Sequence, residues 1–442
     1  MEKQSSKKKA QHWLIGSGSN SLKSKQVMDL ITKINDKNGL GNSGGNHAIL
    51  PPHLVRKKAD GGQRKENEFM DEVLGLILDS EKRPTKTQIE KIAAKYGITD
   101  KTEAKELTEL AIVEEARRRA SGAWDAREAM NEILQLYAIQ PNLSQRDSIS
   151  MMLQQYSTPA PIAYLLGCYV GLQDLAKTGG KALEPSAGNG MLTIASPRRD
   201  IFTVNEVDTF RRGNLARFDY KSVTGFDASK PIGDWSKAFD AVITNPPFSK
   251  LIKREQTSYG PFKIKDLDHL MAIHALSYMQ DNGKAAVIVG GHTTYDEKDH
   301  VQMGKNRMFL GYLYHHYNVE DVINVDGDLY SRMGTKFDIR LILVNGRNAV
   351  LGGLPPKKSE SSETVNSYEA LTDRVLGLIP SEPPVPLRPK DSGRYPKESI
   401  AIALQLEMEM LALEMEMEAD KAKAKAKAKA ARARLLLLEK DN

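Results

Sequence analysis

The stretch LEPSAGNG, residues 183–190, decides the fold because it joins a short apolar run to a glycine-rich turn. Gly188 and Gly190 give the turn the backbone freedom that a close approach to a ligand requires. Glu184 offers an acceptor for a positively charged amine. No Lys-Ser or Lys-Thr pair follows the glycines, so the stretch does not match a phosphate-binding P-loop. It predicts a ligand site where a strand ends at the carboxyl edge of a sheet.

On both sides of this stretch, from residue 148 to residue 347, β-rich runs alternate with helical runs. The strand candidates are KALEPS, IFTVNE, FDAVIT and AAVIVGG, which begin at residues 181, 201, 239 and 285. Strands that alternate with helices predict a parallel sheet covered on both faces. Two further runs, VEDVINVD and FDIRLILVNG, predict an antiparallel hairpin at the end of this sheet. The predicted fold class is α/β, with a Rossmann-like sheet.

The composition of the remaining segments divides the 442-residue chain into five parts. A basic arm rich in Gly, Ser and Asn precedes a helical region, and a Pro-rich linker and a charged, low-complexity helical tail follow the sheet. In the arm, GLGNSGGN matches G-x-G-x-x-G formally, but no strand precedes it and no helix follows it. The predicted parts are residues 1–65 (arm), 66–147 (helical region), 148–347 (catalytic domain), 348–397 (linker) and 398–442 (tail).

The helical region has clear helix signals. Apolar residues of 69–78 fall on one face, and Thr85 with Gln88 forms a capping box before a helix that stops at Gly97. Two short helices that meet near Gly97 could form a DNA-reading helix-turn-helix. A helical cap packed on the next domain is the interpretation that we favour, because no sequence code for the DNA-reading motif is present.

The charge and composition set loose bounds on partners and location. The net charge of +6 mildly favours an anionic partner such as nucleic acid. The single cysteine, Cys168, excludes a disulfide framework and a thiolate metal cluster. The first residues carry charge without an apolar core, and no apolar run reaches the ~20 residues of a membrane span. We therefore expect a cytoplasmic protein without membrane association.

A second motif, NPPF at residues 245–248, follows a predicted strand. The consecutive prolines fix the backbone, so that Asn245 and the carbonyl of Pro246 converge as rigid acceptors for an aromatic amine. Pro247 completes this rigid turn, and Phe248 offers a flat surface on which a planar base can stack. Glu206, at the end of another strand, is suited to binding both hydroxyls of a ribose. An adenosine with an amine and without a pyrophosphate describes S-adenosyl-L-methionine.

The order of LEPSAGNG before NPPF resembles the adenine-N6 DNA methyltransferases. A third segment, QQYSTPAPIAYLLG, resembles the Y-x-T-P segment of that family. The resemblance covers residues 150 to 347 and implies that Tyr156 and Thr158 help hold the methionine portion of the cofactor. It also implies that Asp227 contacts the adenine of the cofactor, and it gives Pro185 of the first motif to the cofactor site. No metal is expected.

The resemblance implies that DNA is the partner, with the target adenine flipped out of the duplex. An RNA adenine or a protein glutamine methyltransferase is the alternative enzyme, and a catalytically silent cofactor-binding or DNA-binding module is the alternative of another class. The chain lacks an obvious recognition domain, so a short or relaxed target is expected. Two loops, SKLIKREQTSYGPFKIK and KNRMFLGYLYHHYN, are candidates for DNA contacts. The family suggests a bacterial, phage or mobile-element source, and the tail could support an oligomer, although a solvated helix or disordered arm is favoured for it.

Overall fold

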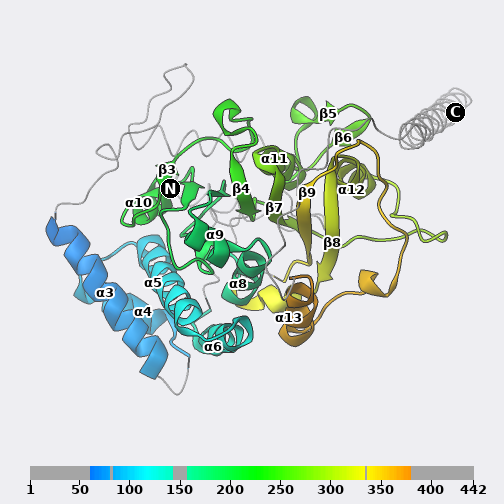
Figure 1. Ribbon diagram of the computed structural model, residues 1–442. Coiled ribbons are helices and arrows are strands. Elements are labelled where there is room, and N and C mark those ends of the chain that lie inside the picture. The colour runs from blue at the N-terminus through cyan, green and yellow to red at the C-terminus, as the bar shows by residue number, and fades with distance from the viewer. Residues whose placement is uncertain (1–59, 80–82, 143–156, 334–335, 380–442) are drawn as a thin grey trace, which may run out of the picture.

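The computed structural model describes residues 60–79, 83–142, 157–333 and 336–379, which form helices around one large sheet (Figure 1). The helices before the sheet are α3 (Asp60–Asp79), α4 (Lys86–Lys95), α5 (Lys101–Gly122) and α6 (Ala126–Ile139). The helices within and after the sheet region are α8 (Ala160–Tyr169), α9 (Leu172–Thr178), α10 (Thr209–Leu215), α11 (Leu267–Ser277), α12 (Lys305–His316) and α13 (Tyr368–Gly377). Short 3₁₀ turns are η2 (Met191–Thr193), η3 (Gly233–Trp235), η4 (Lys253–Glu255), η5 (Gly327–Met333) and η6 (Glu360–Ser362).

The large sheet has seven strands in the order β3-β2-β1-β4-β7-β9-β8. Its strands are β1 (Ala182–Glu184), β2 (Phe202–Asn205), β3 (Ser222–Thr224), β4 (Phe239–Thr244), β7 (Met279–Gly290), β8 (Tyr317–Val325) and β9 (Ile339–Arg347). The pairs among β3, β2, β1, β4 and β7 are parallel, whereas β9 is antiparallel to both β7 and β8. The predicted Rossmann-like α/β fold with an antiparallel terminal hairpin is confirmed.

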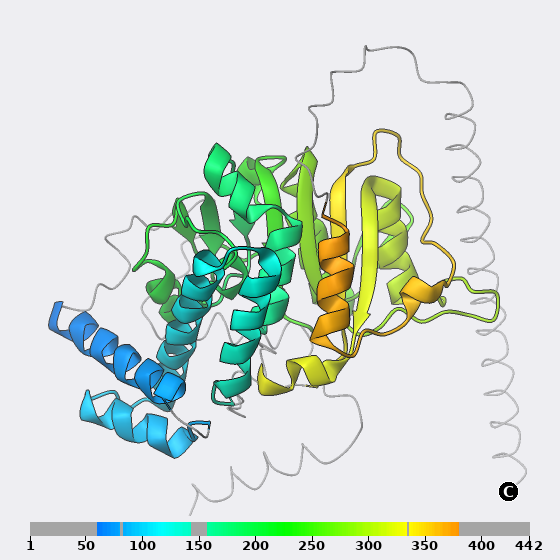
Figure 2. The ribbon, with the colours of Figure 1, turned by 60° about the horizontal axis from the view of Figure 1, so that its bottom comes forward.

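Alternating side chains of the strands fill two separate cores. In β4, Ala241 and Ile243 belong to the core that also contains residues of α8, α9 and α13, while Val242 belongs to the core that contains residues of α11 and α12. Both faces of the sheet are therefore covered by helices, as its apolar strands predict. Figure 2 shows α13 beside β8 on one face and α12 on the other.

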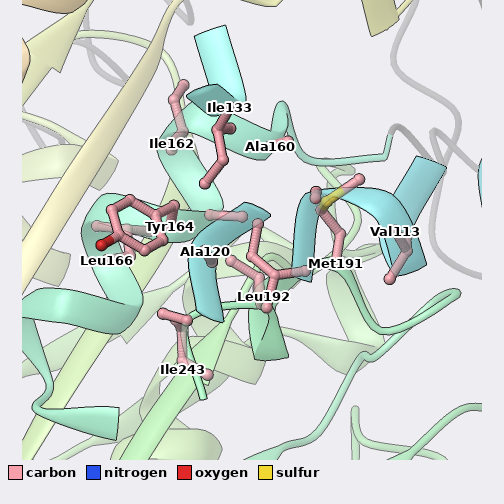
Figure 3. Close-up of a cluster of buried hydrophobic side chains, with 14 of the residues drawn as sticks. Val113, Ala120, Ile133, Ala160, Ile162, Tyr164, Leu166, Met191, Leu192 and Ile243 are labelled. Carbon is pink, nitrogen blue, oxygen red and sulfur yellow. The ribbon is translucent and has the colours of Figure 1, made fainter. Parts of the chain in front are cut away.

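The helical region shares its core with the sheet. Figure 3 shows how Val113 of α5 and Ile133 of α6 gather with side chains of α8, with Met191 and Leu192 of η2, and with Ile243 of β4. The helix signals match the structure here, since Thr85 and Gln88 form the capping box and Gly97 follows α4 with a φ of 76°. This packing supports the cap interpretation of α3 to α6. How the chain divides into domains stays a prediction.

The segment predicted as an extended linker contains a folded part. Residues 368–377 form α13, in which Leu371 and Val375 are fully buried, and Arg374 donates two hydrogen bonds to Asp321 of β8. The prediction of a linker from residue 348 is wrong for this helix. The Pro-rich stretches on both sides of this helix favoured the prediction of an extended linker, although the helix itself has apolar positions.

A small hairpin and several predicted segments complete the description. Strands β5 (Thr257–Tyr259) and β6 (Phe262–Ile264) pair antiparallel within the first basic loop. Residues 1–59 of the predicted arm, Tyr156 and the charged tail lie outside the described residues, whereas residues 60–65, predicted as part of the arm, begin α3. Within the part of the chain that the structure describes, no helix has the length and apolar character to cross a membrane.

Candidate active site

A large cavity lies where the strand order of the sheet reverses. From β1 the chain proceeds outward to β2 and β3, and then it returns to β4 on the other side of β1. Parallel sheets bind ligands at such a point, outside the carboxyl ends of the strands. A cavity of about 1080 Å³, including its open mouth, is lined there by residues that follow β1, β2, β3 and β4.

The loop after β1 has the conformation that its glycines predict. Gly188 and Gly190 have φ values of 54° and 89°, which L side chains rarely adopt. A Cβ atom at Gly190 would lie 2.6 Å from the hydroxyl of Tyr220, so this glycine is also required for packing. Gly188 lines the cavity, whereas Gly190 does not.

Glu184 lies beneath this loop as a fully buried acid. Its side chain has no exposed surface, and neither carboxylate oxygen meets a hydrogen-bond partner among the described residues. Burial, and secondarily the charge of Glu206, raise its pKa well above the ordinary value. The neighbouring Pro185 lines the cavity, but Glu184 itself is not part of the lining.

Glu206 joins the loop after β1 to the end of β2. Its two carboxylate oxygens accept hydrogen bonds from the backbone nitrogens of Gly188 (2.8 Å) and Asp208 (2.7 Å). The side chain is 6% exposed and lines the cavity. Burial raises the pKa of its carboxyl group. Glu206 therefore fixes the glycine loop and still faces the cavity with a carboxylate.

Asn205 ties together the loops that follow β1 and β3. Its amide nitrogen donates to the carbonyl oxygens of Pro185 and Phe226, each at 3.0 Å. Its amide oxygen accepts from the hydroxyl of Thr224 (2.8 Å) and from the backbone nitrogen of Phe226 (2.7 Å). A buried amide with these four bonds holds its neighbours in one arrangement.

Asp227 lies after β3 and lines the same cavity. One carboxylate oxygen accepts from the backbone nitrogen and the hydroxyl of Ser229, at 3.0 and 2.6 Å. The other oxygen lies 3.3 Å from Nζ of Lys230, which is largely exposed. The carboxylate thus has a fixed orientation at the end of the third strand.

The tetrad Asn245–Phe248 follows β4 directly, and all four of its residues line the cavity. The amide nitrogen of Asn245 donates to the hydroxyls of Thr158 (3.0 Å) and Tyr330 (3.4 Å). These two bonds fix the orientation of the amide. The ring of Phe248 lies close to Gly290 at the end of β7, where an added Cβ would be 3.2 Å from Cγ of the ring.

One wall of the cavity comes from the helical region. Glu106 of α5 accepts two hydrogen bonds from Arg211 of α10, at 2.8 and 3.0 Å, and one from Asn189 of the glycine loop at 2.7 Å. Burial alone would raise the pKa of Glu106, but the charge and hydrogen bonds of Arg211 lower it to about 2. Arg211 of α10 and Glu109 of α5 both line the cavity. We call Glu106, Glu109, Arg211 and Asn189 the α5 cluster.

A second buried cluster lies behind Phe248. The backbone nitrogen of Gly290 donates to Asp268 (3.0 Å), and its carbonyl oxygen accepts from Arg340 (3.1 Å). Asp266 pairs with Lys305, and His269 stacks on Phe309 at a centroid distance of 4.0 Å. We call this set the β7 cluster; its members are Asp266, Asp268, His269, Lys305 and Arg340.

The structure brings most of the predicted site residues to one cavity. The cavity is lined by Thr158, Pro185, Gly188, Glu206, Asp227 and the tetrad 245–248. Glu184 and Gly190 lie next to it as buried supports, and Tyr156 lies outside the described residues. The residues that sequence reasoning missed are Asn205, Glu106, Glu109, Arg211 and Tyr330.

The two loops predicted to contact DNA differ from that prediction in part. Lys253, Arg254 and Lys263 are exposed, as a basic loop requires. The aromatic residues turn inward, because Phe262 is buried and the hydroxyl of Tyr259 lies 3.0 Å from Nε2 of His274. In the second loop, residues 305–316 form α12, and the His315–His316 pair packs against aromatic rings instead of pointing into solvent.

Part of the chain matches a known family of proteins. Residues 211–351 match the family model described as N-6 DNA Methylase, and the matched segment contains the tetrad. The match covers about a third of the chain and agrees with the resemblance that the motifs predict, to the adenine-N6 DNA methyltransferases. It also supports S-adenosyl-L-methionine as the cofactor.

Two curated relatives match shorter stretches. The Type II methyltransferase M.AccI of Acinetobacter calcoaceticus is 29% identical over 153 residues, which are 30% of this chain and 27% of the relative. The rRNA N(6)-adenosine-methyltransferase Mettl5 of Drosophila melanogaster is 35% identical over 108 residues, which are 22% of this chain and 50% of the relative. The chain therefore spans between about a quarter and a half of the length of these relatives.

Among solved structures, the chain aligns with a putative class I S-adenosylmethionine-dependent methyltransferase from Listeria monocytogenes. It has 12% sequence identity and a TM-score of 0.37, and the alignment covers 72% of this chain and 97% of that chain. A modification subunit of a putative type I restriction enzyme from Vibrio vulnificus YJ016 has 12% identity and a TM-score of 0.36, with 73% of each chain covered.

Proposed function

We propose that the protein transfers a methyl group from S-adenosyl-L-methionine to N6 of adenine in DNA. The observation that carries this proposal is that the tetrad Asn245–Phe248 lines the same cavity as Glu206 and Asp227. Acceptors for an aromatic amine thus share one space with carboxylates suited to an adenosine. A scaffold that only binds the cofactor has no use for the tetrad.

The residues of the cavity fit the cofactor. The carboxylate of Glu206 is suited to the ribose hydroxyls and that of Asp227 to the amino group of the cofactor's adenine. Gly188 leaves its backbone open to the cavity that it lines, because, apart from its chain neighbours, no heavy atom lies within 4 Å of a Cβ built there. The hydroxyl of Thr158, which lines the cavity, is suited to the methionine portion, and the buried carboxylate of Glu184 lies next to the cavity without lining it. The bound cofactor supplies an electrophilic methyl group.

The tetrad would hold the target amine. The amide oxygen of Asn245 and the carbonyl of Pro246 accept the two hydrogens of N6, which leaves its lone pair directed along the path of transfer. Thr158 and Tyr330 keep Asn245 in this orientation through their hydrogen bonds to its nitrogen. As the new N–C bond forms, the bond between the methyl carbon and the sulfur of the cofactor would break, and the cofactor would be left as a neutral thioether. N6 would become positive, and the two oxygens would stabilise that charge until a proton leaves to solvent.

DNA is the proposed substrate, with the target adenine flipped out and stacked on Phe248. Flipping costs a few kcal/mol, which the stacking and the hydrogen bonds offset. The exposed Lys253, Arg254 and Lys263 are suited to phosphates, so affinity for DNA should fall with salt. Contacts of this kind are the same for all sequences, which favours a target of about one to four base pairs.

RNA is the second candidate substrate. The observation that favours it is the 35% identity with the curated rRNA N(6)-adenosine-methyltransferase. We prefer DNA because the fourth residue of the tetrad is Phe248. A direct comparison of DNA and RNA as substrates separates the two candidates.

The decisive experiment offers unmethylated plasmid DNA, RNA and a protein extract side by side to the full chain with labelled S-adenosylmethionine. We expect label in DNA, on adenine N6. Asn245→Ala should lower turnover by roughly 100-fold or more, because it removes an acceptor that acts at the reacting amine. Its cofactor affinity should stay nearly the same.

The matched control is Asn318→Ala, since Asn318 is an exposed residue of β8 whose amide donates to the carbonyl of Asn345 at 3.0 Å. It should retain full activity. Label in RNA alone would overturn the choice of substrate, and full activity of Asn245→Ala would overturn the assigned chemistry.

A further inference from the structure

Glu109 is a buried acid of α5 that borders the cofactor cavity. It is 2% exposed and belongs to the lining. One carboxylate oxygen accepts from the hydroxyl of Ser157 at 2.5 Å, and the other has no hydrogen-bond partner among the residues that the structure describes. A buried oxygen without a partner costs free energy, so it commonly marks a position that a ligand satisfies.

The position of Glu109 along the cavity corresponds to one end of the cofactor. Ser157, its partner, adjoins Thr158, and the hydroxyl of Thr158 accepts from Asn245. Glu109 is therefore near the tetrad. Asp227, which we propose for the adenine of the cofactor, instead follows β3. In S-adenosylmethionine the sulfur joins the adenosine to the methionine. With the adenosine at Glu206 and Asp227 and the methyl group at Asn245, the methionine extends toward Ser157 and Glu109.

The charges beside Glu109 suit an amino acid. The α-amino and α-carboxyl groups of the methionine portion carry opposite charges. Arg211 lines the same cavity and is held by its two hydrogen bonds to Glu106, so a fixed positive charge lies near the acid. A carboxylate and a guanidinium on two different elements can receive the two groups of a zwitterion.

We infer that Glu109 accepts a hydrogen bond from the α-ammonium group of S-adenosylmethionine, so that the helical region completes the cofactor site. This inference rests on the proposed function. It makes α5 part of the binding machinery and not only a cap on the sheet. The competing acceptor is Glu184, whose two buried oxygens also lack partners among the described residues.

The test measures binding of two ligands to the full chain by calorimetry. S-adenosylmethionine has the amino acid portion, whereas 5′-methylthioadenosine has the same adenosine and lacks it. Glu109→Gln should weaken binding of S-adenosylmethionine by about 10-fold to 100-fold, because a hydrogen bond between charged groups is lost. Binding of 5′-methylthioadenosine should change by less than about twofold, which also shows that the variant is folded.

Glu115→Gln is the matched control, because Glu115 is a buried acid of the same helix that pairs with Arg118 and Arg119 and is not part of the cavity lining. It should change neither affinity. Equal losses for both ligands in Glu109→Gln would overturn the inference, since they indicate a structural role of α5. Unchanged affinities in Glu109→Gln with a selective loss in Glu184→Gln would assign the ammonium group to Glu184 instead. If the unsubstituted chain binds neither ligand, the proposed function fails, and this inference fails with it.

Discussion

The α5 cluster and the β7 cluster both hold buried acids beside basic side chains, yet the pKa values of Glu106 and Asp268 shift in opposite directions. In the α5 cluster, Glu106 and Arg211 bond directly through two hydrogen bonds, and the pKa of Glu106 is lowered to about 2. In the β7 cluster, burial and the nearby Asp266 raise the pKa of Asp268 to about 6, and burial lowers that of Arg340 to about 10. A direct bidentate contact decides which effect dominates.

The two clusters also differ in their position relative to the cavity: the α5 cluster borders it, whereas the β7 cluster supports the end of β7. The α5 cluster borders the cavity, so its charges are available to a ligand. In the β7 cluster, the side-chain atoms of Asp266, Asp268 and His269 that could bind a metal ion lie within 4.8 Å of one another, as in a cation site. Lys305 and Arg340 already supply positive charge there. This cluster therefore holds the end of β7 through Gly290.

The largest expected effect comes from breaking the ion pair of the α5 cluster. Arg211→Met should lower the free energy of unfolding by about 3–5 kcal/mol, because Glu106 remains as a buried charge that has lost its bidentate partner and is left with the longer contact with Lys105 at 3.6 Å. Denaturant unfolding measures this loss. The control is Arg118→Met, whose side chain is 71% exposed and should contribute at most about 1 kcal/mol. Equal losses in the two variants would contradict the comparison.

The second prediction uses pH, because the pKa values of Glu106 and Asp268 shift in opposite directions. Ionisation of Glu106 therefore stabilises the fold, whereas ionisation of Asp268 destabilises it. The folded pKa of Glu106, about 2, is below its ordinary value of 4.5, so its stabilisation is fully present above pH 4.5 and is lost as the pH falls through about 2. The folded pKa of Asp268, about 6, is above 3.8, so its cost is absent below pH 3.8 and is fully present above about pH 6.

Matched substitutions test these signs. At about pH 7, Asp268→Asn should raise the free energy of unfolding by up to about 3 kcal/mol, and Glu106→Gln should lower it by a similar amount. The gain should disappear as the pH falls toward 4, whereas the loss should persist to lower pH. Unfolding curves at several pH values measure both. A gain from Glu106→Gln at neutral pH would show that burial, and not Arg211, dominates at that site.

The smallest expected effect connects the β7 cluster to the tetrad. In Gly290→Ala the new Cβ would lie 3.2 Å from Cγ of Phe248, so the ring must move by a few tenths of an ångström. Turnover should fall by roughly 3-fold to 10-fold, because the base then stacks out of position. Gly233→Ala is the control, since nothing lies within 4 Å of a Cβ there. Unchanged turnover in Gly290→Ala would mean that Phe248 does not position the base.

The sequence predicts the sheet and its strand-end residues well, for a physical reason. In a parallel sheet each strand end faces the ligand, so a polar residue after an apolar run, such as Glu206 or Asn245, indicates a site directly. The same reasoning placed Gly188 at the cavity, and the family resemblance placed Asp227 there, where the structure has both.

The α5 cluster could not be predicted in this way. Glu106 and Glu109 lie on a helix, and nothing in a single sequence relates Glu106 to Arg211, which is 105 residues away. Helix α5 is buried on nearly all sides, whereas glutamates and arginines in a sequence indicate solvent exposure. A glutamate flanked by apolar residues, as in the stretch from 107 to 113, is the signal that could have indicated a buried acid.

Asn205 has a consequence for the speed of the proposed reaction. Because its amide saturates its hydrogen bonds with Pro185, Thr224 and Phe226, the loops around the cofactor need not order themselves at every turnover. A preorganised pocket loses little conformational entropy when it is filled. The cofactor should then enter and leave by simple diffusion through the mouth of the cavity. Under saturating DNA, the slow step would be extrusion of the base or release of the methylated strand.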